Sequence, residues 1–190
     1  NMSDAFVLKL DSSGDLVWAK SFGGSSNHET GRAIAVDSSG NVYVTGEFHA
    51  TADFDPGDGT AELTPGASAN GYALKLDSSG DYVWAKQFGF GDGGESIAVD
   101  SSGNVHITGT FTGTADFDPG EGTAELTSGT YNSQDPYVLK LDSSGNYLWV
   151  KSFTCNSACG SDSVAVDSSG NVYTTGYFRN TVDFDPGAGT

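Results

Sequence analysis

Basic residues, cysteine and proline are scarce in this sequence of 190 residues, and charged residues of every kind make up only 17% of it. Eight lysines and arginines stand against 25 acidic residues, which leaves a net charge of −17. This field repels nucleic-acid phosphates and anionic membrane surfaces, so we expect no nucleic-acid partner. No apolar run approaches the roughly 20 residues of a membrane-spanning helix, and we expect no membrane insertion. The acidity favours cations, or simply keeps a secreted protein in solution.

Cysteine occurs only as Cys155 and Cys159, within the segment TCNSACGSD. A disulfide between them would close a very short loop and stabilise the fold little. It would be consistent with an oxidising compartment. A zinc site is the weaker alternative, because no histidine or second cysteine pair accompanies the two residues.

Glycine is abundant, with 27 residues, and the apolar and aromatic residues return in a fixed order. Three segments align almost without gaps around Trp18, Trp84 and Trp149, which are 66 and 65 residues apart. The sequence therefore divides into three repeats, at residues 1–71, 72–136 and 137–190. Each repeat carries three blocks, which in the first repeat read FVLKLDSSGDLVWAKSFG, AIAVDSSGNVYVTGEF and ADFDPGDGT.

The tetrapeptide Asp-Ser-Ser-Gly occurs six times and predicts six tight turns. Its aspartate can accept hydrogen bonds from the following amides and its glycine can take a positive φ, which suits a type I turn closed by a glycine bulge. Alternating strands flank these turns, so that Val42 and Val44 share one face while Tyr43 and Thr45 share the other. No stretch has a sustained helical period. Each repeat is therefore predicted to contain four antiparallel strands.

Tandem four-stranded units predict an all-β fold made of β-propeller blades. The small residues of AIAVD suit the crowded innermost strand, with NVYVTGEF, VLKLD and LVWAKSFG following outward. On this assignment the chain starts with the outer half of one blade and ends with the inner half of another, and two complete blades lie between them. A β-solenoid is the main alternative, but its repeats are usually shorter and lack the paired hairpins.

Three blade equivalents are too few to close a ring, because propellers use roughly 4–8 blades. We expect either that a longer parent chain supplies the other blades or that two copies associate into a six-bladed ring. Because the sequence begins and ends within its repeat pattern, association by strand complementation is favoured. An open stack would leave sheet edges exposed, which proteins avoid.

The repeats resemble the bacterial SBBP family of β-propeller repeats. The resemblance rests on AFVLKLDSSGDLVWAKSFGGSSNHETGRAIAVDSSGNVYVTGEF and its two later echoes, and it covers about two-thirds of each repeat. It implies a location outside the cell or at the surface of bacteria or archaea, in a scaffold or binding role. The DFDPG segment makes these repeats longer than the family's usual unit, so the family's seven-blade count is not carried over.

The loop ADFDPGDGT is the best candidate for a binding site, because calcium takes six to eight oxygen ligands from carboxylates and carbonyls in flexible loops. The candidate ligands are Asp53, Asp55 and Asp58 in the first repeat, Asp116, Asp118 and Glu121 in the second, and Asp183 and Asp185 in the third. Ala188 replaces the last acid of the third copy, where we expect a weaker or absent site. The alternative is that Asp-Pro-Gly only makes a turn while Phe54, Phe117 and Phe184 fill the core, although a turn explains one aspartate and not the preceding one.

No set of residues predicts a catalytic site. His28, His49 and His106 occupy different repeat positions, and the recurrent serines are turn residues. A glycosidase uses one pair of carboxyl groups, whereas acids recur here in every repeat. The tryptophans could line a carbohydrate cleft, but recurrence within strands favours the core. The recurrent lysines are expected to face solvent or to pair with turn aspartates; they are Lys9, Lys75 and Lys140, with Lys20, Lys86 and Lys151.

We therefore expect a non-enzymatic extracellular scaffold, adhesion or assembly module that calcium stabilises and that associates through blade-to-blade contacts. The alternative is a lectin-like propeller that binds a carbohydrate or protein ligand through its rim loops. The differing loops SSNHET, GDGG and TCNSACGSD argue against three equal sites of that kind.

Overall fold

Each Asp-Ser-Ser-Gly segment closes a hairpin in the computed structural model of the chain, which describes residues 3–25, 28–66, 69–89, 91, 93–129, 134–155 and 157–187. In the first turn, the N–H of Gly14 donates to the carbonyl of Asp11 at 3.0 Å. The Asp11 carboxylate accepts hydrogen bonds from the N–H groups of Ser13 and Asp15. Gly14 has a φ of +87°, and the glycines of the other five turns have φ between 80° and 84°. Glycine adopts this region at little cost, so the predicted turn is confirmed in all six copies.

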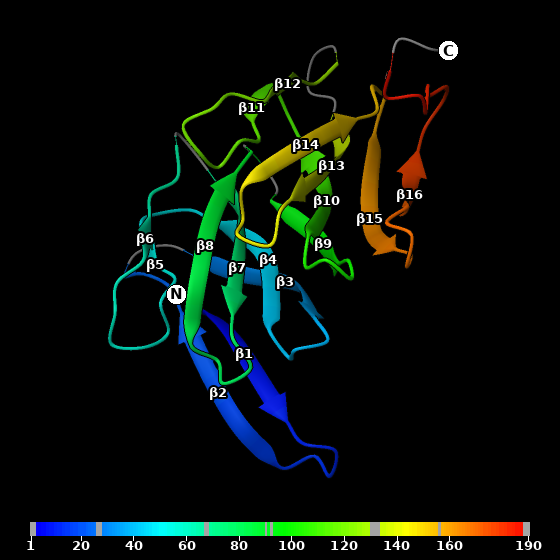
Figure 1. Ribbon diagram of the computed structural model, residues 1–190. Helices are drawn as coiled ribbons and strands as arrows, with labels where there is room; N and C mark the ends of the chain where they lie inside the picture. Colours follow the sequence, from blue (N-terminus) through cyan, green and yellow to red (C-terminus); the bar gives the residue numbers. More distant parts are fainter. Residues whose placement is uncertain are drawn as a thin grey trace.

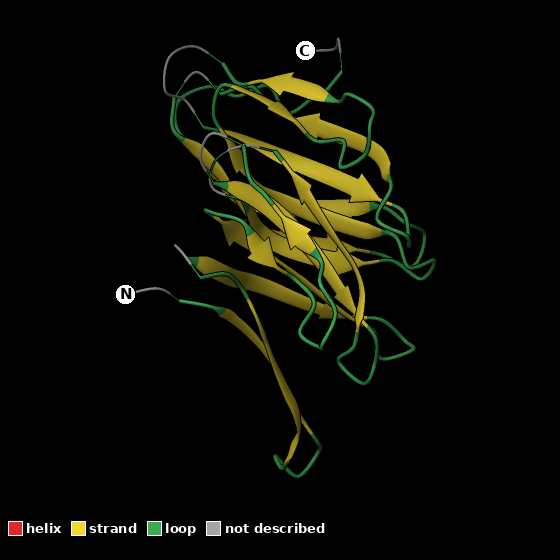
Figure 2. Ribbon diagram, turned by 90° about the vertical axis from the view of Figure 1, so that its left-hand side faces the viewer, coloured by secondary structure: helices red, strands yellow, loops and turns green. Residues whose placement is uncertain are grey.

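Two four-stranded antiparallel sheets form the middle of the molecule. The first has the order β3 (Glu29–Val36), β4 (Val42–Phe48), β7 (Asn70–Leu76) and β8 (Tyr82–Phe88). The second has the order β9 (Gly94–Val99), β10 (Val105–Phe111), β13 (Asp135–Leu141) and β14 (Tyr147–Ser152). Each sheet has the strand order predicted for one blade, and the part of the chain that is described contains no helix (Figure 2).

Two-stranded hairpins lie at the two ends of this stack (Figure 1). The hairpin of β1 (Ala5–Leu10) and β2 (Leu16–Phe22) corresponds by repeat position to β7–β8 and β13–β14, so it is the outer half of a blade. The hairpin of β15 (Cys159–Val166) and β16 (Val172–Phe178) corresponds to β3–β4 and β9–β10, so it is an inner half. Blade and sequence repeat are therefore out of phase, and the repeat boundaries at 71–72 and 136–137 fall inside β7 and β13.

The first two DFDPG segments lie in excursions between the second and third strands of the two complete blades, and the third follows β16 (Val172–Phe178). Short pairs of strands hold the excursions, and these are β5 (Ala52–Asp53) with β6 (Glu62–Leu63) and β11 (Thr114–Asp116) with β12 (Glu125–Thr127). The phenylalanines of these two segments turn inward, because Phe54 and Phe117 have no exposed surface. These loops are therefore part of the core as well as of the surface.

The blades stack through their inner strands, since β3 contacts β9 and β9 contacts β15. Ala33 and Ala35 of β3 pack against the core of the second blade, where Ile97 of β9 is buried. The small side chains that marked AIAVD as the innermost strand therefore allow close approach between neighbouring blades. The β1–β2 hairpin projects at one end of the stack and β15–β16 lies at the other (Figure 1).

Candidate functional site

An aromatic cluster forms around the phenylalanine of the first DFDPG loop. The ring of Phe54 lies 4.9 Å from that of Tyr72, 5.3 Å from Phe48 and 5.5 Å from Phe22, measured between centroids. These four side chains come from a loop and three strands, and all are buried. Phe54 therefore joins the β1–β2 hairpin to the first complete blade.

The second repeat builds the same cluster from Phe88, Phe111, Phe117 and Tyr137. The Phe117 ring lies 4.6 Å from Tyr137 and 5.4 Å from Phe111, and Phe88 lies 6.3 Å from Tyr137. The tyrosine hydroxyl at this position reaches the inner strands, because Tyr72 donates to Thr30 and Tyr137 to Gly93, in both cases to the backbone carbonyl.

The third cluster contains three of the four aromatic positions among the described residues. The Phe184 ring lies 5.3 Å from Phe178 and 6.1 Å from Phe153. Phe178 and Phe184 are 53% and 59% exposed, whereas their counterparts in the other clusters are buried. A groove of about 320 Å³ opens beside them, lined by these three rings, the disulfide and Gly176.

Both aspartates of each DFDPG segment hold their own loop through Oδ1. Asp53 accepts from the N–H groups of Asp55 at 3.0 Å and Ala61 at 2.8 Å, and Asp55 accepts from Gly57 at 2.8 Å. The second copy repeats these bonds through Asp116 and Asp118, and the third repeats the two local ones through Asp183 and Asp185. A backbone role thus exists for both aspartates, and not only for the one that sequence analysis assigned to the turn.

The third acid of each predicted calcium set makes no such contribution to the loop. Asp58 and Glu121 are exposed, and Ala188 lies outside the described residues. Among the described residues, a group of at least three ligand atoms from His, Cys, Asp or Glu within 4.8 Å of one another occurs only at Asp135, Cys155 and Cys159. The carboxylates of one acidic loop do not converge in this way, and calcium binding there stays a prediction.

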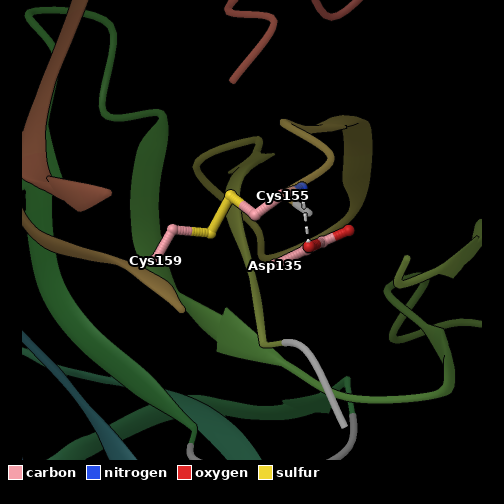
Figure 3. Close-up of side chains that lie close together, drawn as sticks. All are labelled: Asp135, Cys155 and Cys159. Carbon is pink, nitrogen blue, oxygen red and sulfur yellow. Dashed lines mark hydrogen bonds between the residues drawn. A yellow bond between two sulfur atoms is a disulfide. The ribbon is translucent and has the colours of Figure 1, made fainter. Parts of the chain in front are cut away.

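Asp135 and the two cysteines form a buried anchor for the loop before β15 (Figure 3). Cys155 and Cys159 are joined by a disulfide, and the Asp135 carboxylate accepts from the N–H of Cys155 at 3.0 Å and of Gly129 at 2.9 Å. Because both sulfurs are in the disulfide, the group offers no thiolate to a metal. In the first repeat the corresponding loop is held by the Glu29 carboxylate, which accepts from the N–H of Gly24 at 3.3 Å.

In the first two outer hairpins, β1–β2 and β7–β8, a tryptophan and a lysine bind a turn of the next blade, a contact called here the tryptophan–lysine grip. Trp18 Nε1 and Lys9 Nζ both donate to the carbonyl of Ser78, at 3.3 and 2.8 Å. Trp84 Nε1 and Lys75 Nζ donate in the same way to the carbonyl of Ser143, at 3.2 and 3.3 Å. The lysine prediction was therefore wrong for Lys9 and Lys75, which bind a turn carbonyl across the blade interface. Trp84 is 9% exposed and offers no open stacking face.

His106 lies in the core rather than in a catalytic cluster. It is fully buried and occupies the position of Tyr43, with Nε2 3.3 Å from Asp100 Oδ2. Lys140 Nζ lies 3.5 Å from the same oxygen. Burial lowers the pKa of His106, although the hydrogen bond to Asp100 opposes this shift. The imidazole thus takes the place of the phenol of Tyr43 and Tyr173, each of which donates to its turn aspartate.

Tandem four-stranded antiparallel sheets that stack through their inner strands define β-propeller blades. The β-propeller repeat family SBBP matches residues 17–47 and 83–118, so the chain is a β-propeller repeat protein. An uncharacterized WD repeat-containing protein of Acanthamoeba polyphaga mimivirus is 26% identical over 200 residues, which cover 92% of this chain. The regulatory protein FlaEY of Caulobacter vibrioides is 28% identical over 109 residues, or 56% of this chain. The alignments span only 14% and 11% of those two proteins.

Within the described residues, no helix has the length and apolar character to cross a bilayer.

Proposed function

We propose that the chain is a non-enzymatic assembly module of an extracellular or cell-surface scaffold, built from β-propeller blades. The observation that carries this proposal is the repetition of structural devices. The aromatic cluster, the tryptophan–lysine grip and the Asp-Ser-Ser-Gly turn each recur from blade to blade. Active sites are normally unique in a chain, whereas packing devices recur. The disulfide is consistent with an oxidising compartment outside the cytoplasm.

Calcium binding to the acidic loops is the second part of the proposal. In the first loop, the hydrogen bonds from the backbone use Oδ1 of Asp53 and Asp55. The Oδ2 atoms, the exposed carboxylate of Asp58 and nearby carbonyls are the oxygen ligands left for a hard cation. Such extracellular sites bind calcium with dissociation constants of about 0.1–1 mM. The ion would stiffen loops whose phenylalanines complete the core.

Thermal unfolding with calcium and then with excess chelator tests this proposal. The calcium concentration, 5 mM, is on the order of ten times the expected dissociation constant. We expect calcium to raise the unfolding midpoint. A double variant, Asp58→Asn with Glu121→Gln, should abolish the rise and leave the calcium-free midpoint unchanged, because neither exposed side chain supports its loop. If calcium does not change the unfolding midpoint of the wild-type chain, the calcium proposal is wrong and the DFDPG loops serve only as turns that place a phenylalanine in the core.

A further inference from the structure

The groove beside β16 occupies the place where the other two clusters hold a tyrosine. Tyr72 and Tyr137 pack on Phe54 and Phe117, at 4.9 and 4.6 Å between ring centroids. In the third cluster Phe184 lines the groove and is 59% exposed, and Tyr177 lines the groove as well. The groove of about 320 Å³ therefore has room and apolar neighbours for one more aromatic side chain.

The chain carries a matching aromatic side chain at its opposite end. Tyr72 and Tyr137 directly precede the segments ALKL of β7 and VLKL of β13, and Phe6 directly precedes VLKL in β1. Phe6 is 72% exposed, although both tyrosines at the same position are buried. A phenylalanine with this exposure lacks the packing that its repeat position normally provides.

We propose that the groove receives Phe6 of a second copy of this chain, and that β1 of that copy pairs antiparallel with β16. The inner half-blade β15–β16 of one copy and the outer half-blade β1–β2 of the other then form one four-stranded blade, called here the split blade. This proposal rests on the assembly role proposed above and specifies which strands make the contact between two copies. The register follows from the intact blades, where Gly46 lies opposite Tyr72 and Gly109 opposite Tyr137. Gly176 of β16 therefore lies opposite Phe6 of the second copy.

The glycine of this strand lies between the neighbouring inner strand and the aromatic ring. A Cβ on Gly46 would collide with the Thr30 carbonyl oxygen and lie 3.1 Å from the Tyr72 ring, and one on Gly109 would collide with the Gly93 carbonyl oxygen and lie 3.1 Å from the Tyr137 ring. Gly176 makes the same close approach to its own inner strand, at the Gly160 carbonyl oxygen, and no ring is among the described atoms nearest to a Cβ there. The neighbouring threonine supports the same register, because Thr45 donates to the carbonyl of Tyr72 at 2.7 Å and Thr108 to that of Tyr137 at 2.6 Å.

The turns give independent evidence for the same junction. A Cβ on Gly80 would lie 3.2 Å from Trp18, and one on Gly145 would lie 3.2 Å from Trp84. Around Gly14, the corresponding turn glycine, no described atom lies within 4 Å of such a Cβ. With β1–β2 of a second copy beside β16, its turn would meet Trp149 and Lys140 as the other turns meet their tryptophan and lysine.

The turns of the inner hairpins β3–β4, β9–β10 and β15–β16 also differ in whether a neighbouring blade lies against them. A Cβ on Gly40 would lie 3.2 Å from Ser78, and one on Gly103 would lie 3.3 Å from Ser143. Around Gly170 no described atom lies within 4 Å of such a Cβ. In the proposed pairing, Ser12 of the second copy takes this place.

The opposite end of the stack exposes the complementary face. Ile34 of β3 is 55% exposed, whereas Ile97 at the same position of β9 is 7% exposed because the first blade covers it. The β15–β16 hairpin of a second copy would cover Ile34 in the same way. The two half-blades lie at opposite ends of one chain (Figure 1), so each copy offers what the other lacks. Two copies would hold six blade equivalents, within the range of closed propellers.

Sedimentation of the 190-residue chain with matched variants tests this pairing. We expect the wild-type chain to sediment as a dimer of 19.6 kDa copies, and Phe6→Ala to weaken association on the order of 100-fold. Val83→Ala is the control, because Val83 is also exposed, at 45%, but lies on a complete blade. Circular dichroism would show that both variants keep the β fold. A wild-type chain that stays monomeric at all concentrations would overturn the proposal and leave the groove to another repeat or partner.

Cysteine cross-linking tests the register of the pairing. Val44 lies opposite Leu74 and Ile107 opposite Leu139, so Thr174 should lie opposite Leu8 of the second copy. Mild oxidation of a Leu8→Cys, Thr174→Cys chain should give covalent dimers, whereas Leu8→Cys with Thr175→Cys should not. Equal cross-linking of both would overturn the register. Because the calcium experiment measures the unfolding midpoint and sedimentation measures mass, a monomeric chain that calcium stabilises would overturn the pairing and keep the calcium proposal.

Discussion

The Tyr72 ring lies 4.9 Å from the Phe54 ring, so a strand of the blade is packed directly on a residue of an acidic loop. Tyr137 and Phe117 repeat this relationship at 4.6 Å in the next blade. The loop is thereby coupled to the core that holds neighbouring blades together. This coupling makes a surface loop important for stability, and it makes the open third cluster an attractive interface.

Removing the loop phenylalanine should affect the repeats unequally. Phe54→Ala and Phe117→Ala should each lower the free energy of unfolding by about 3–5 kcal/mol, the usual cost of truncating a buried phenylalanine. In the background of Phe6→Ala, where association is weakened, Phe184→Ala should cost much less because Phe184 is 59% exposed. Urea unfolding measures all three. Equal losses would contradict the assignment of the third cluster as open.

The tryptophan–lysine grip should contribute to blade stacking. Trp84→Phe keeps an aromatic ring but removes the Nε1–H that donates to the Ser143 carbonyl at 3.2 Å. The expected loss is about 0.5–1.5 kcal/mol of unfolding free energy, typical of one hydrogen bond. Trp149→Phe should cost less in the background of Phe6→Ala, where association is weakened, if its partner turn belongs to a second copy. A larger loss for Trp149 than for Trp84 would contradict this account.

The turn aspartates should make the fold sensitive to acid. Hydrogen bonds from the N–H groups of Asp81 and Ser79 hold the pKa of Asp77 below its usual value. At Asp167 the side chain and the N–H of Asn171 have the same effect on the pKa. A lowered pKa in the folded state means that the stabilisation is present above the unfolded pKa and is lost as pH falls through the folded value. The urea concentration at the unfolding midpoint should therefore decrease as the pH falls below about 4. Asp77→Asn should make this decrease with pH less steep.

Glu29 should act in the opposite direction. Burial raises its pKa, the nearby Asp4 adds to the shift, and the hydrogen bond from Gly24 opposes it. Because the folded state then binds the proton more tightly, stability should fall as pH rises from the usual pKa of 4.5 through the raised one. Glu29→Gln should remove this decrease and raise stability at neutral pH. Unfolding of both proteins between pH 4 and 8 checks this, and identical slopes would contradict it.

Much of the fold could be predicted because its signals are local and repeated. The six turns, the strand order within a blade and the half-blades at the ends follow from turn residues, alternation and the phase of the repeat. The grip of Lys9 and Trp18 on Ser78 could not be predicted, since these residues meet only through the stacking of two blades. The spacing of residues along one strand does not specify which residues of two stacked blades come into contact.

The candidate site was predictable only in part. The inward-facing Phe54 and Phe117 were anticipated, but the bond from the Ala61 N–H to Asp53 was not, because it spans a loop whose shape the sequence pattern does not specify. Asp135 was also missed. Its only local signal is its place at the start of a strand before a proline, which does not reveal that it holds the Cys155 amide.

The most direct measurement of the completed split blade is hydrogen exchange along β16 at two protein concentrations, with β4 as the internal reference. The account predicts that the edge amides of β16 become protected at high concentration, approach the protection of β4, and lose it in Phe6→Ala. Rapid exchange of β16 at both concentrations in the wild-type chain would show that its edge stays unpaired, and it would contradict the completion of the split blade by a second copy.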